Sequence, residues 1–215
     1  NAHSKLAKWF ESHAFKEDYN IVSNDRASEE IPYQWQQAQE WKKLQSTLTE
    51  QDMLVAILED RSEQELLSYW LILEANIKTD IETQYEKAWK KWNLNEIEEK
   101  TGDIAQELAD FFSFAGRYKD FTERLYRLGL KLREKVLGPE HPDTAISLNN
   151  LGLLLKHKGD YDGAEPLFRR SLEIREKVLG PEHPDTAISL NHLGGIFLHK
   201  GDYDGAEPLY RRSLE

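Results

Sequence analysis

The chain contains a long stretch of its own sequence twice, at a spacing of 42 residues. Residues 133–173 and 175–215 differ at only six positions, and both copies contain the unbroken run GPEHPDTAISL. A fixed period of this length is the signature of a solenoid, in which one supersecondary unit stacks on the next. This part of the chain is therefore predicted to fold as a row of similar units that bury their apolar faces against each other.

The spacing of apolar residues inside each copy indicates helices. Apolar side chains recur every three or four residues, which is typical of one face of an α-helix. The KGDY stretch at 158–161 interrupts this pattern with a glycine that suits a helix C-terminus. Each unit is therefore predicted to be a helix, a tight turn and a second helix. In the first copy the residues at this spacing are Leu148, Leu151, Leu155, Ala164, Phe168, Ser171 and Leu172.

These positions resemble the tetratricopeptide repeat. Counting from Ala145, the family pattern is matched seven times in the first copy and seven times in the second. The unit is longer than is usual in the family, and in this it resembles the 42-residue variant of kinesin light chains and many bacterial repeat arrays. The resemblance implies an all-α solenoid. The matching residues are Leu148, Leu151, Gly152, Leu155, Ala164, Phe168 and Ser171, and then Leu190, Leu193, Gly194, Phe197, Ala206, Tyr210 and Ser213.

The His-Pro-Asp triplet at 141–143 can look catalytic. Pro142 suits the first turn of a helix, where its missing N–H costs nothing, and Asp143 is placed to cap backbone N–H groups and meet the positive end of the helix dipole. The triplet also resembles that of the J-domain of heat-shock co-chaperones, but there it occurs once, between helices of another pattern. Because it recurs at 183–185, we interpret it as a repeated connector between units.

A third, degenerate copy lies upstream of the two regular ones. The stretch LADFFSFAGRY at 108–118 parallels LGLLLKHKGDY at 151–161, with one additional residue before the next REKVLG run. No polar capping helix follows the last repeat, so we expect the parent protein to carry further repeats. We divide the chain into a helical region at 1–100 and a repeat region at 101–215, which holds a degenerate repeat at 101–135, a regular one at 144–177 and a regular but truncated one at 186–215.

The first hundred residues show no such period and contain all six tryptophans of the chain. The polar stretch at 17–30 is predicted to be a loop, and Pro32 is predicted to begin the helix that follows it. Helix-start signals and apolar residues at helical spacing predict helices near 3–15, 33–47, 50–60, 63–76 and 79–92.

Three stretches of this region resemble the STAND family of signal-transducing ATPases, whose nephrocystin-type and many bacterial members end in tetratricopeptide arrays. They are HSKLAKWFE at 3–11, IPYQWQQAQEWKKLQSTL at 31–48 and ELLSYW at 65–70. The resemblance implies that the parent is a regulatory ATPase and that this chain is its sensor or scaffold arm. The phosphate-binding motif G-x-x-x-x-G-K-[ST] does not occur in the sequence, so the chain itself is expected to be no enzyme.

Composition argues against several other functions. The formal net charge of −11 disfavours a nucleic-acid partner, because phosphate binding needs clustered Lys and Arg. The absence of cysteine removes disulfides and thiolate zinc sites and fits a reducing cytoplasm. No apolar run approaches the length of a membrane span, and no signal peptide opens the sequence. We therefore expect a cytoplasmic protein with no membrane partner and no cofactor.

Two histidines, His157 and His199, recur at equivalent places and raise the question of a metal site. Packed helices lie about 8–10 Å apart, so one ion could not bridge equivalent residues of adjacent repeats without reorientation. We interpret both as surface residues near helix C-termini, where the helix dipole favours them.

The resemblance implies that the first helix of each repeat lines the concave face of a superhelix, where family members hold peptides. Asparagine both donates and accepts hydrogen bonds, so an Asn ladder can grip a peptide backbone. Five of the six differences between the copies lie in the first helix. Two explanations are open: diversification of a binding surface, or drift in packing residues after duplication. The predicted peptide groove comprises Ile146, Asn149, Asn150, Leu153 and Lys156, followed by Ile188, Asn191, His192, Gly195 and Leu198.

Two other hypotheses compete with peptide binding. In the first, the repeats are a structural spacer or associate with themselves through the open end of the solenoid, with no foreign ligand. In the second, the tryptophan-rich half is an enzyme. The enzyme hypothesis requires a deep pocket with convergent polar groups among Trp35, Trp41 and Trp70, rather than rings packed as core.

Overall fold

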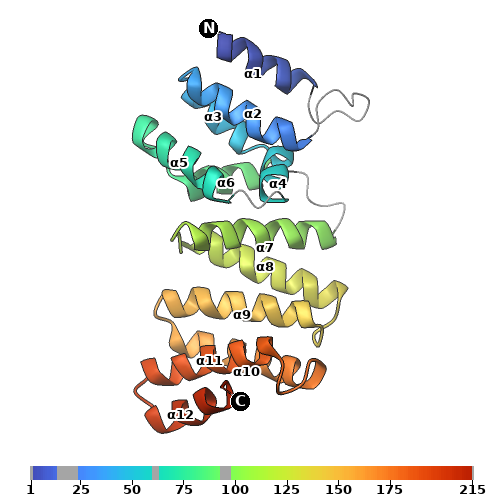
Figure 1. Ribbon diagram of the computed structural model, residues 1–215, viewed down its shortest axis with the longest axis vertical. Helices are drawn as coiled ribbons and strands as arrows, with labels where there is room; N and C mark the ends of the chain where they lie inside the picture. The colour runs from blue at the N-terminus through green and yellow to red at the C-terminus, as the bar shows by residue number, and fades with distance from the viewer. Residues whose placement is uncertain (1, 14–23, 60–62, 93–97, 215) are drawn as a thin grey trace. The chain divides into compact units, whose positions relative to one another are not determined.

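The computed structural model describes residues 2–13, 24–59, 63–92 and 98–214, and the regular structure within these ranges is α-helical (Figure 1). The predicted all-α class is confirmed. The chain divides into two compact units, Asn1–Asn93 and Leu94–Glu215, which are described separately. Among the described helices, none is both long enough and apolar enough to cross a membrane.

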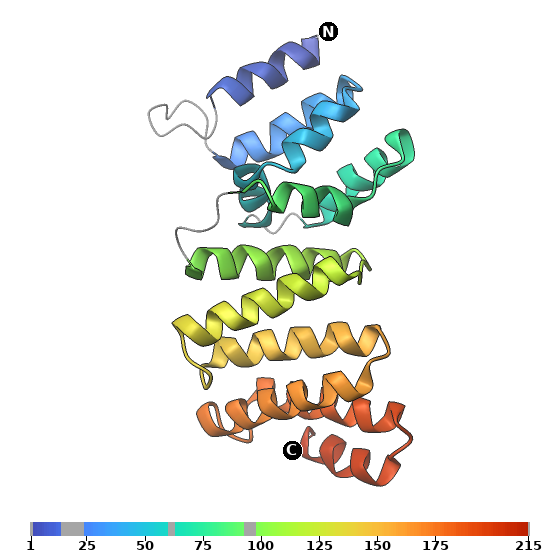
Figure 2. The same cartoon turned by 180° about the vertical axis from the view of Figure 1, so that it is seen from behind.

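The second unit is a row of helical hairpins (Figures 1 and 2). In each hairpin a first helix is followed by a tight turn and a second helix, and each hairpin contacts the next along the chain. The three hairpins described here are α7 (Glu98–Phe114) with α8 (Asp120–Val136), α9 (Pro142–His157) with α10 (Tyr161–Val178), and α11 (Pro184–His199) with α12 (Tyr203–Arg212).

The turn inside each hairpin depends on glycine. Gly159 and Gly201 have φ of 79° and 78°, in the left-handed region where other residues are strained. The next residue, Asp160, accepts a hydrogen bond at 2.9 Å from the backbone N–H of Gly163 and so caps α10. The KGDY stretch therefore ends one helix and starts the next, and the second regular copy repeats both contacts.

The His-Pro-Asp triplet lies in the link between hairpins, but its capping residue differs from the expected one. The sequence favours Asp143 as the capping side chain. In the structure the cap of α9 is His141, whose Nδ1 accepts a hydrogen bond at 3.2 Å from the Asp143 backbone N–H, while Pro142 lies in the first turn. The Thr144 hydroxyl donates to the Gly138 carbonyl at 2.8 Å and closes the link. The His141 ring nitrogen is the capping group because it lies two residues before the N–H from which it accepts, within hydrogen-bond reach.

The repeated apolar residues form the core of the hairpins. Leu148, Leu151 and Phe168 are each no more than 1% exposed, and burial of such side chains stabilises a fold by roughly 1.5–3 kcal/mol each. A Cβ placed on Gly152 would lie 2.9 Å from the ring of Phe168. Gly152 is thus the point at which the first helix admits the ring from the second, as its match to the repeat pattern predicts.

The first unit consists of six shorter helices in the ranges that the structure describes (Figure 1). Its contacts join neighbours along the chain and also α2 to α4 and α3 to α5. The helices are α1 (Ala2–His13), α2 (Asn24–Gln37), α3 (Trp41–Leu48), α4 (Gln51–Glu59), α5 (Glu63–Ile77) and α6 (Ile81–Trp89).

The predictions for residues 17–47 are partly wrong. The expected loop at 17–30 is helical from Asn24 onward, while 17–23 lie outside the described residues, and Pro32 lies inside α2 instead of beginning it. The apolar residues that fix α2, Ile31 and Trp35, lie in its C-terminal half, so the apolar pattern marks only that half. The single helix expected at 33–47 is two helices, because the chain reverses at Gln39, whose φ is 58°.

Aromatic residues form the core of the first unit. Trp35 and Trp70 are fully buried, whereas Trp41 is partly exposed. The Tyr85 hydroxyl donates to the Leu48 carbonyl at 2.7 Å, and its ring lies 5.4 Å from that of Trp70. Trp35 and Trp70 are therefore packed as core, which argues against the enzyme hypothesis in the form that requires them to line a deep pocket.

Candidate functional site

The first helices α9 and α11 carry the predicted groove residues, and we call the surface that they share with the preceding first helix, α7, the first-helix face. Within the described residues α9 contacts both α7 and α11, so the three first helices follow one another in space. Polar side chains of neighbouring first helices contact one another and are largely buried. Several apolar side chains on the same helices are exposed.

Asn149 and His192 meet between α9 and α11. Nδ1 of His192 lies 2.7 Å from Oδ1 of Asn149, and because a carbonyl oxygen can only accept, the ring donates from Nδ1. Burial lowers the pKa of His192 to about 4, with smaller contributions from the nearby cations Lys156 and Arg175. The His192 ring also packs against the Phe168 ring, with their centroids 5.3 Å apart. At neutral pH this uncharged histidine therefore joins two hairpins, and Asn149 is only 6% exposed.

Asn150 is engaged with α7 through Asp110. The Asp110 carboxylate accepts hydrogen bonds from Asn150 Nδ2 at 3.1 Å, from the Tyr126 hydroxyl at 2.7 Å and from Gln106 Nε2 at 3.2 Å. Burial raises the pKa of Asp110, and these hydrogen bonds oppose the rise. Asp110 and Tyr126 were not anticipated, because they lie in the degenerate repeat, where the family pattern is weakest. For Asp110 the only signal is the alignment of 108–118 with 151–161, and Tyr126 lies outside that stretch.

The remaining groove residues are more accessible. The side chains of Ile146, Ile188 and Leu198 are 39%, 43% and 46% exposed. Leu153 and Lys156 are partly exposed. Asn191 is exposed, and its Oδ1 accepts a hydrogen bond from the Ser213 hydroxyl at 2.8 Å. Gly195 is buried beside the end of the Lys156 side chain. The first-helix face therefore combines free aliphatic side chains with polar groups beside them.

The two histidines considered for a metal site stack on tyrosines instead. The His157 ring lies 5.0 Å from that of Tyr118 and the His199 ring 5.0 Å from that of Tyr161, with interplanar angles of 18° and 6°. Within the described ranges no group of three or more His, Cys, Asp or Glu is arranged to hold a metal ion.

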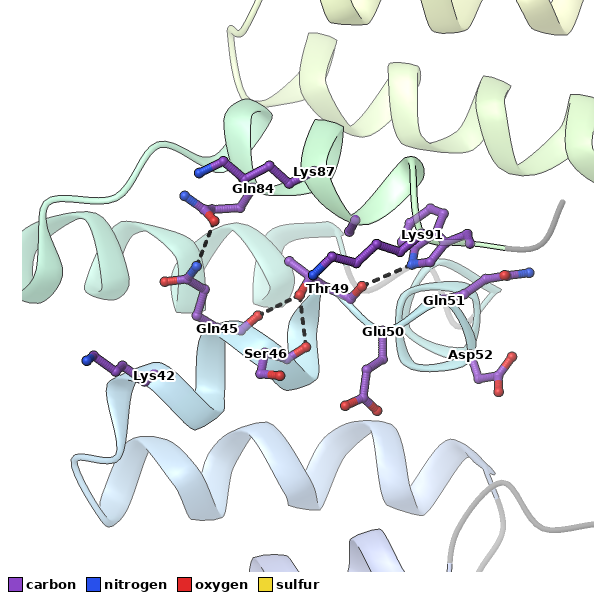
Figure 3. A pocket seen from close by; sticks show the side chains of 12 residues that line it. Lys42, Gln45, Ser46, Thr49, Glu50, Gln51, Asp52, Gln84, Lys87 and Lys91 are labelled. Carbon is purple, nitrogen blue, oxygen red and sulfur yellow. Dashed lines mark hydrogen bonds between the residues drawn. The ribbon is translucent and has the colours of Figure 1, made fainter.

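A polar pocket lies in the first unit, between α3, α6 and the start of α4 (Figure 3). Its volume is about 740 Å³, and its walls carry Lys42, Lys87 and Lys91 together with Glu50 and Asp52. Gln45 Nε2 donates to Gln84 Oε1 at 2.8 Å, and the Thr49 carbonyl accepts from the Trp92 indole at 3.2 Å. Burial raises the pKa of Glu50, helped by Glu11 and Asp52. Because both signs of charge line it, the pocket has no single-sign field to select an ionic ligand.

Comparison with known sequences adds a family to this geometry. The sequence profile of the tetratricopeptide repeat matches residues 101–177 and, in an overlapping placement, 148–215. The chain belongs to the tetratricopeptide repeat family. Arrays of this family are protein-interaction scaffolds, so the chain is a protein-binding repeat module.

Two curated relatives of this tetratricopeptide repeat protein are nephrocystin-3 proteins. Nephrocystin-3 of Mus musculus is 44% identical over 131 residues, which are 59% of this chain and 10% of that protein. Nephrocystin-3 of Xenopus laevis is 43% identical over 144 residues, 65% of this chain and 11% of that protein. The chain thus spans about a tenth of the length of these relatives.

Two solved structures share the fold of this tetratricopeptide repeat protein. BtubC (BKLC) from P. vanneervenii has a TM-score of 0.55 at 22% identity, with 99% of this chain and 87% of that chain covered. A putative kinesin light chain from Podosopora anserina, with nearly identical TPR-like repeats, has a TM-score of 0.56 at 17% identity, with 99% and 92% covered. The predicted likeness to kinesin-light-chain-type repeats is confirmed at the level of the fold.

Proposed function

We propose that this chain holds a peptide segment of a partner protein on the first-helix face. The observation that carries the proposal is the exposure of Ile146, Ile188 and Leu198 on successive first helices. Ile146 and Ile188 are at the same place in neighbouring repeats and form a row that a peptide can cover, and apolar burial is the main source of such affinity.

Polar groups beside this row are suited to the peptide backbone. Asn191 is exposed, and an amide side chain retains free donor and acceptor capacity when only one of its atoms is engaged. Lys156 lies beside Gly195 and supplies a positive charge on an otherwise acidic chain. These groups favour a peptide that combines apolar side chains with an acidic residue or carboxyl terminus.

The test is selection of peptides on the chain, followed by loss of binding in variants. A phage-displayed random peptide library is selected on the immobilised chain, and the dissociation constant of a selected peptide is measured by fluorescence anisotropy. Replacement of both Ile146 and Ile188 by serine is expected to weaken binding at least about tenfold, because two apolar contacts are lost. Val178→Ser, which alters a 47%-exposed aliphatic residue on α10, is the matched control. Equal weakening in the control would overturn the assignment of the face.

We further propose that the parent protein is a regulatory ATPase of the STAND type, located in the cytoplasm, and that this chain is its sensor or scaffold arm. The similarity to nephrocystin-3 and the likeness of residues 3–70 to that family support this proposal. A parent protein that contains this chain is expected to bind a fluorescent ATP analogue, whereas the 215-residue chain is not. A parent that binds no nucleotide would contradict the proposal.

A further inference from the structure

A small pocket lies in the second unit where the start of α7, the end of α8 and the start of α9 meet. Its volume is about 130 Å³. Sites for drug-sized molecules begin at about 300 Å³, so this pocket is sized for a single side chain. We call it the link pocket, and the residues that line it are Asp103, Leu132, Arg133, Val136, Leu137 and Asp143.

The end of α8 gives the link pocket an aliphatic wall. Val136 and Leu137 are 42% and 38% exposed, and Leu132 is partly exposed. A long unbranched side chain can cover such a wall with its methylene groups while its charged end stays near water.

The lining of the link pocket carries a net negative charge, because it holds two carboxylates and one guanidinium group. Arg133 is already engaged, since it donates to Asp103 at 3.1 Å and to the Ser147 hydroxyl at 2.9 Å. The Asp143 Oδ2 atom lies 3.7 Å from Nδ1 of His141, but this nitrogen accepts the Asp143 backbone N–H and so holds no proton that could offset the carboxylate. The remaining negative charge favours a cation.

The link pocket lies at one end of the row formed by Ile146 and Ile188 on the first-helix face. Asp103 precedes Ile146 by 43 residues, as residue 108 precedes 151 in the aligned stretches, so Asp103, Ile146 and Ile188 are equivalent positions on three successive first helices. Asp143 lies three residues before Ile146 on α9, and residues at this spacing are neighbours on one face of a helix. A ligand that covers the row can therefore reach the pocket.

We propose that the link pocket receives a lysine side chain of the peptide that is held on the first-helix face, an inference that rests on the proposed function. The methylene groups of the lysine cover Val136 and Leu137, and its ammonium group meets the carboxylates of Asp103 and Asp143. Lysine suits the pocket better than arginine. A guanidinium group prefers to meet a carboxylate through two parallel hydrogen bonds, and Asp103 already accepts one from Arg133.

The spacing of the first helices sets the spacing of the peptide motif. Packed helices lie about 8–10 Å apart, and a peptide in β-conformation advances about 3.3 Å per residue. The peptide is therefore expected to carry a lysine and two apolar residues at intervals of about three residues, with the apolar residues over Ile146 and Ile188. Lys156, beside Gly195 of α11, favours a negative charge at the end of the peptide opposite to the lysine.

The next link along the chain differs from this one in its charge. Ile146 stands there in place of Asp103, so that of the two carboxylates only the equivalent of Asp143, which is Asp185, is kept. Asp185→Asn is therefore a matched control for Asp143→Asn. Both substitutions remove a carboxylate from the first turn of a helix, but only Asp143 lines the link pocket.

The experiment measures the contribution of the ammonium group in a double-mutant cycle. Peptides are selected from a random phage-displayed library on the immobilised chain, and one with the predicted spacing is synthesised with lysine and with norleucine, which keeps the aliphatic stem without the charge. Dissociation constants are measured by fluorescence anisotropy. Norleucine is expected to weaken binding about three- to tenfold, a modest factor because both carboxylates are half-exposed. The factor should fall to about one on the chain that combines Asp103→Asn with Asp143→Asn, and it should persist on Asp185→Asn.

Three outcomes would overturn the lysine assignment and leave peptide binding on the first-helix face intact. They are selected peptides that lack a lysine at this spacing, an unchanged norleucine factor on the combined variant, and equal or tighter binding of the same peptide with arginine. The serine variants of Ile146 and Ile188 test the face itself, so undiminished binding to them would count against the proposed function instead. A chain that selects no peptide at all would overturn both.

Discussion

The two units of this protein hold their helices together in different ways. The first unit relies on single large side chains, such as Trp70 and Tyr85, each of which makes contacts that occur once. The second unit repeats a few contacts at every hairpin boundary, among them the Tyr-His stack and the Lys-Glu pair. The comparison teaches that a unique core concentrates stability in a few residues, whereas a repeated interface distributes it over many equivalent ones.

Removal of one unique core side chain should have the largest effect. Trp70→Ala deletes a fully buried indole and is expected to cost about 4 kcal/mol of unfolding free energy, measured by urea denaturation. Indole fluorescence reports the first unit alone, because all six tryptophans lie there. Leu71→Ala, at a 52%-exposed neighbour, should cost less than about 1 kcal/mol. Similar losses for the two variants would contradict a unique aromatic core.

Acidification should weaken the second unit through His192. Burial lowers its pKa from the ordinary 6.5 to about 4, so between these values the unfolded chain takes up a proton that the folded protein does not. The stabilisation present above pH 6.5 is therefore lost as the pH falls toward 4, by about 2 kcal/mol. His192→Asn, which installs the residue of the preceding copy, should lack this component. Parallel pH profiles for the two proteins would refute the assignment.

Two glycines should respond in opposite directions to the same substitution. Gly152→Ala places a methyl group 2.9 Å from the buried ring of Phe168 and should cost about 1–2 kcal/mol. Gly195→Ala meets the end of the long Lys156 side chain at 3.2 Å and the Tyr210 hydroxyl at an ordinary contact distance of 3.6 Å, and should stabilise α11 by about 0.5–1 kcal/mol through helix propensity. Urea denaturation followed by far-ultraviolet circular dichroism measures both. Destabilisation of equal size would show that Gly195 is also a packing position.

The smallest effect is expected at a single inter-hairpin ion pair. Lys200→Ala removes contacts to Asp162 and Glu165 that solvent screens, so the loss of unfolding free energy should be the smallest of the series and should shrink at high salt. Lys90→Ala, which removes a pair to Glu86 within α6, serves as the comparison in the first unit. A loss at Lys200 as large as that for Gly152→Ala would mean that one boundary contact dominates its interface.

The sequence predicts the hairpins better than the first unit because repetition supplies independent copies of the same signal. Gly152, Phe168 and their equivalents occur at fixed spacing, so their roles follow from the period. In the first unit the start of α2 carries no apolar periodicity, and Pro32 is accommodated inside the helix rather than at its beginning.

The candidate site is only partly predictable for a related reason. Exposure of Ile146 and Ile188 follows from their place on the first helix of each repeat. The engagement of Asn150 by Asp110 does not, because it joins a regular repeat to a degenerate one across forty residues of sequence. A hydrogen bond between two unlike repeats has no periodic signal, so the sequence alone gives no reason to expect it.

The identical boundary contacts also bear on how such a gene can change. Since each hairpin offers its neighbour the same tyrosine and carboxylates, a recombination event that inserts or deletes a whole 42-residue unit would preserve the Tyr-His stack and the Lys-carboxylate pairs at the remaining junctions, whereas the contacts of Asn150 and His192 differ between junctions. The number of hairpins can therefore vary between descendants while these two repeated contacts are kept.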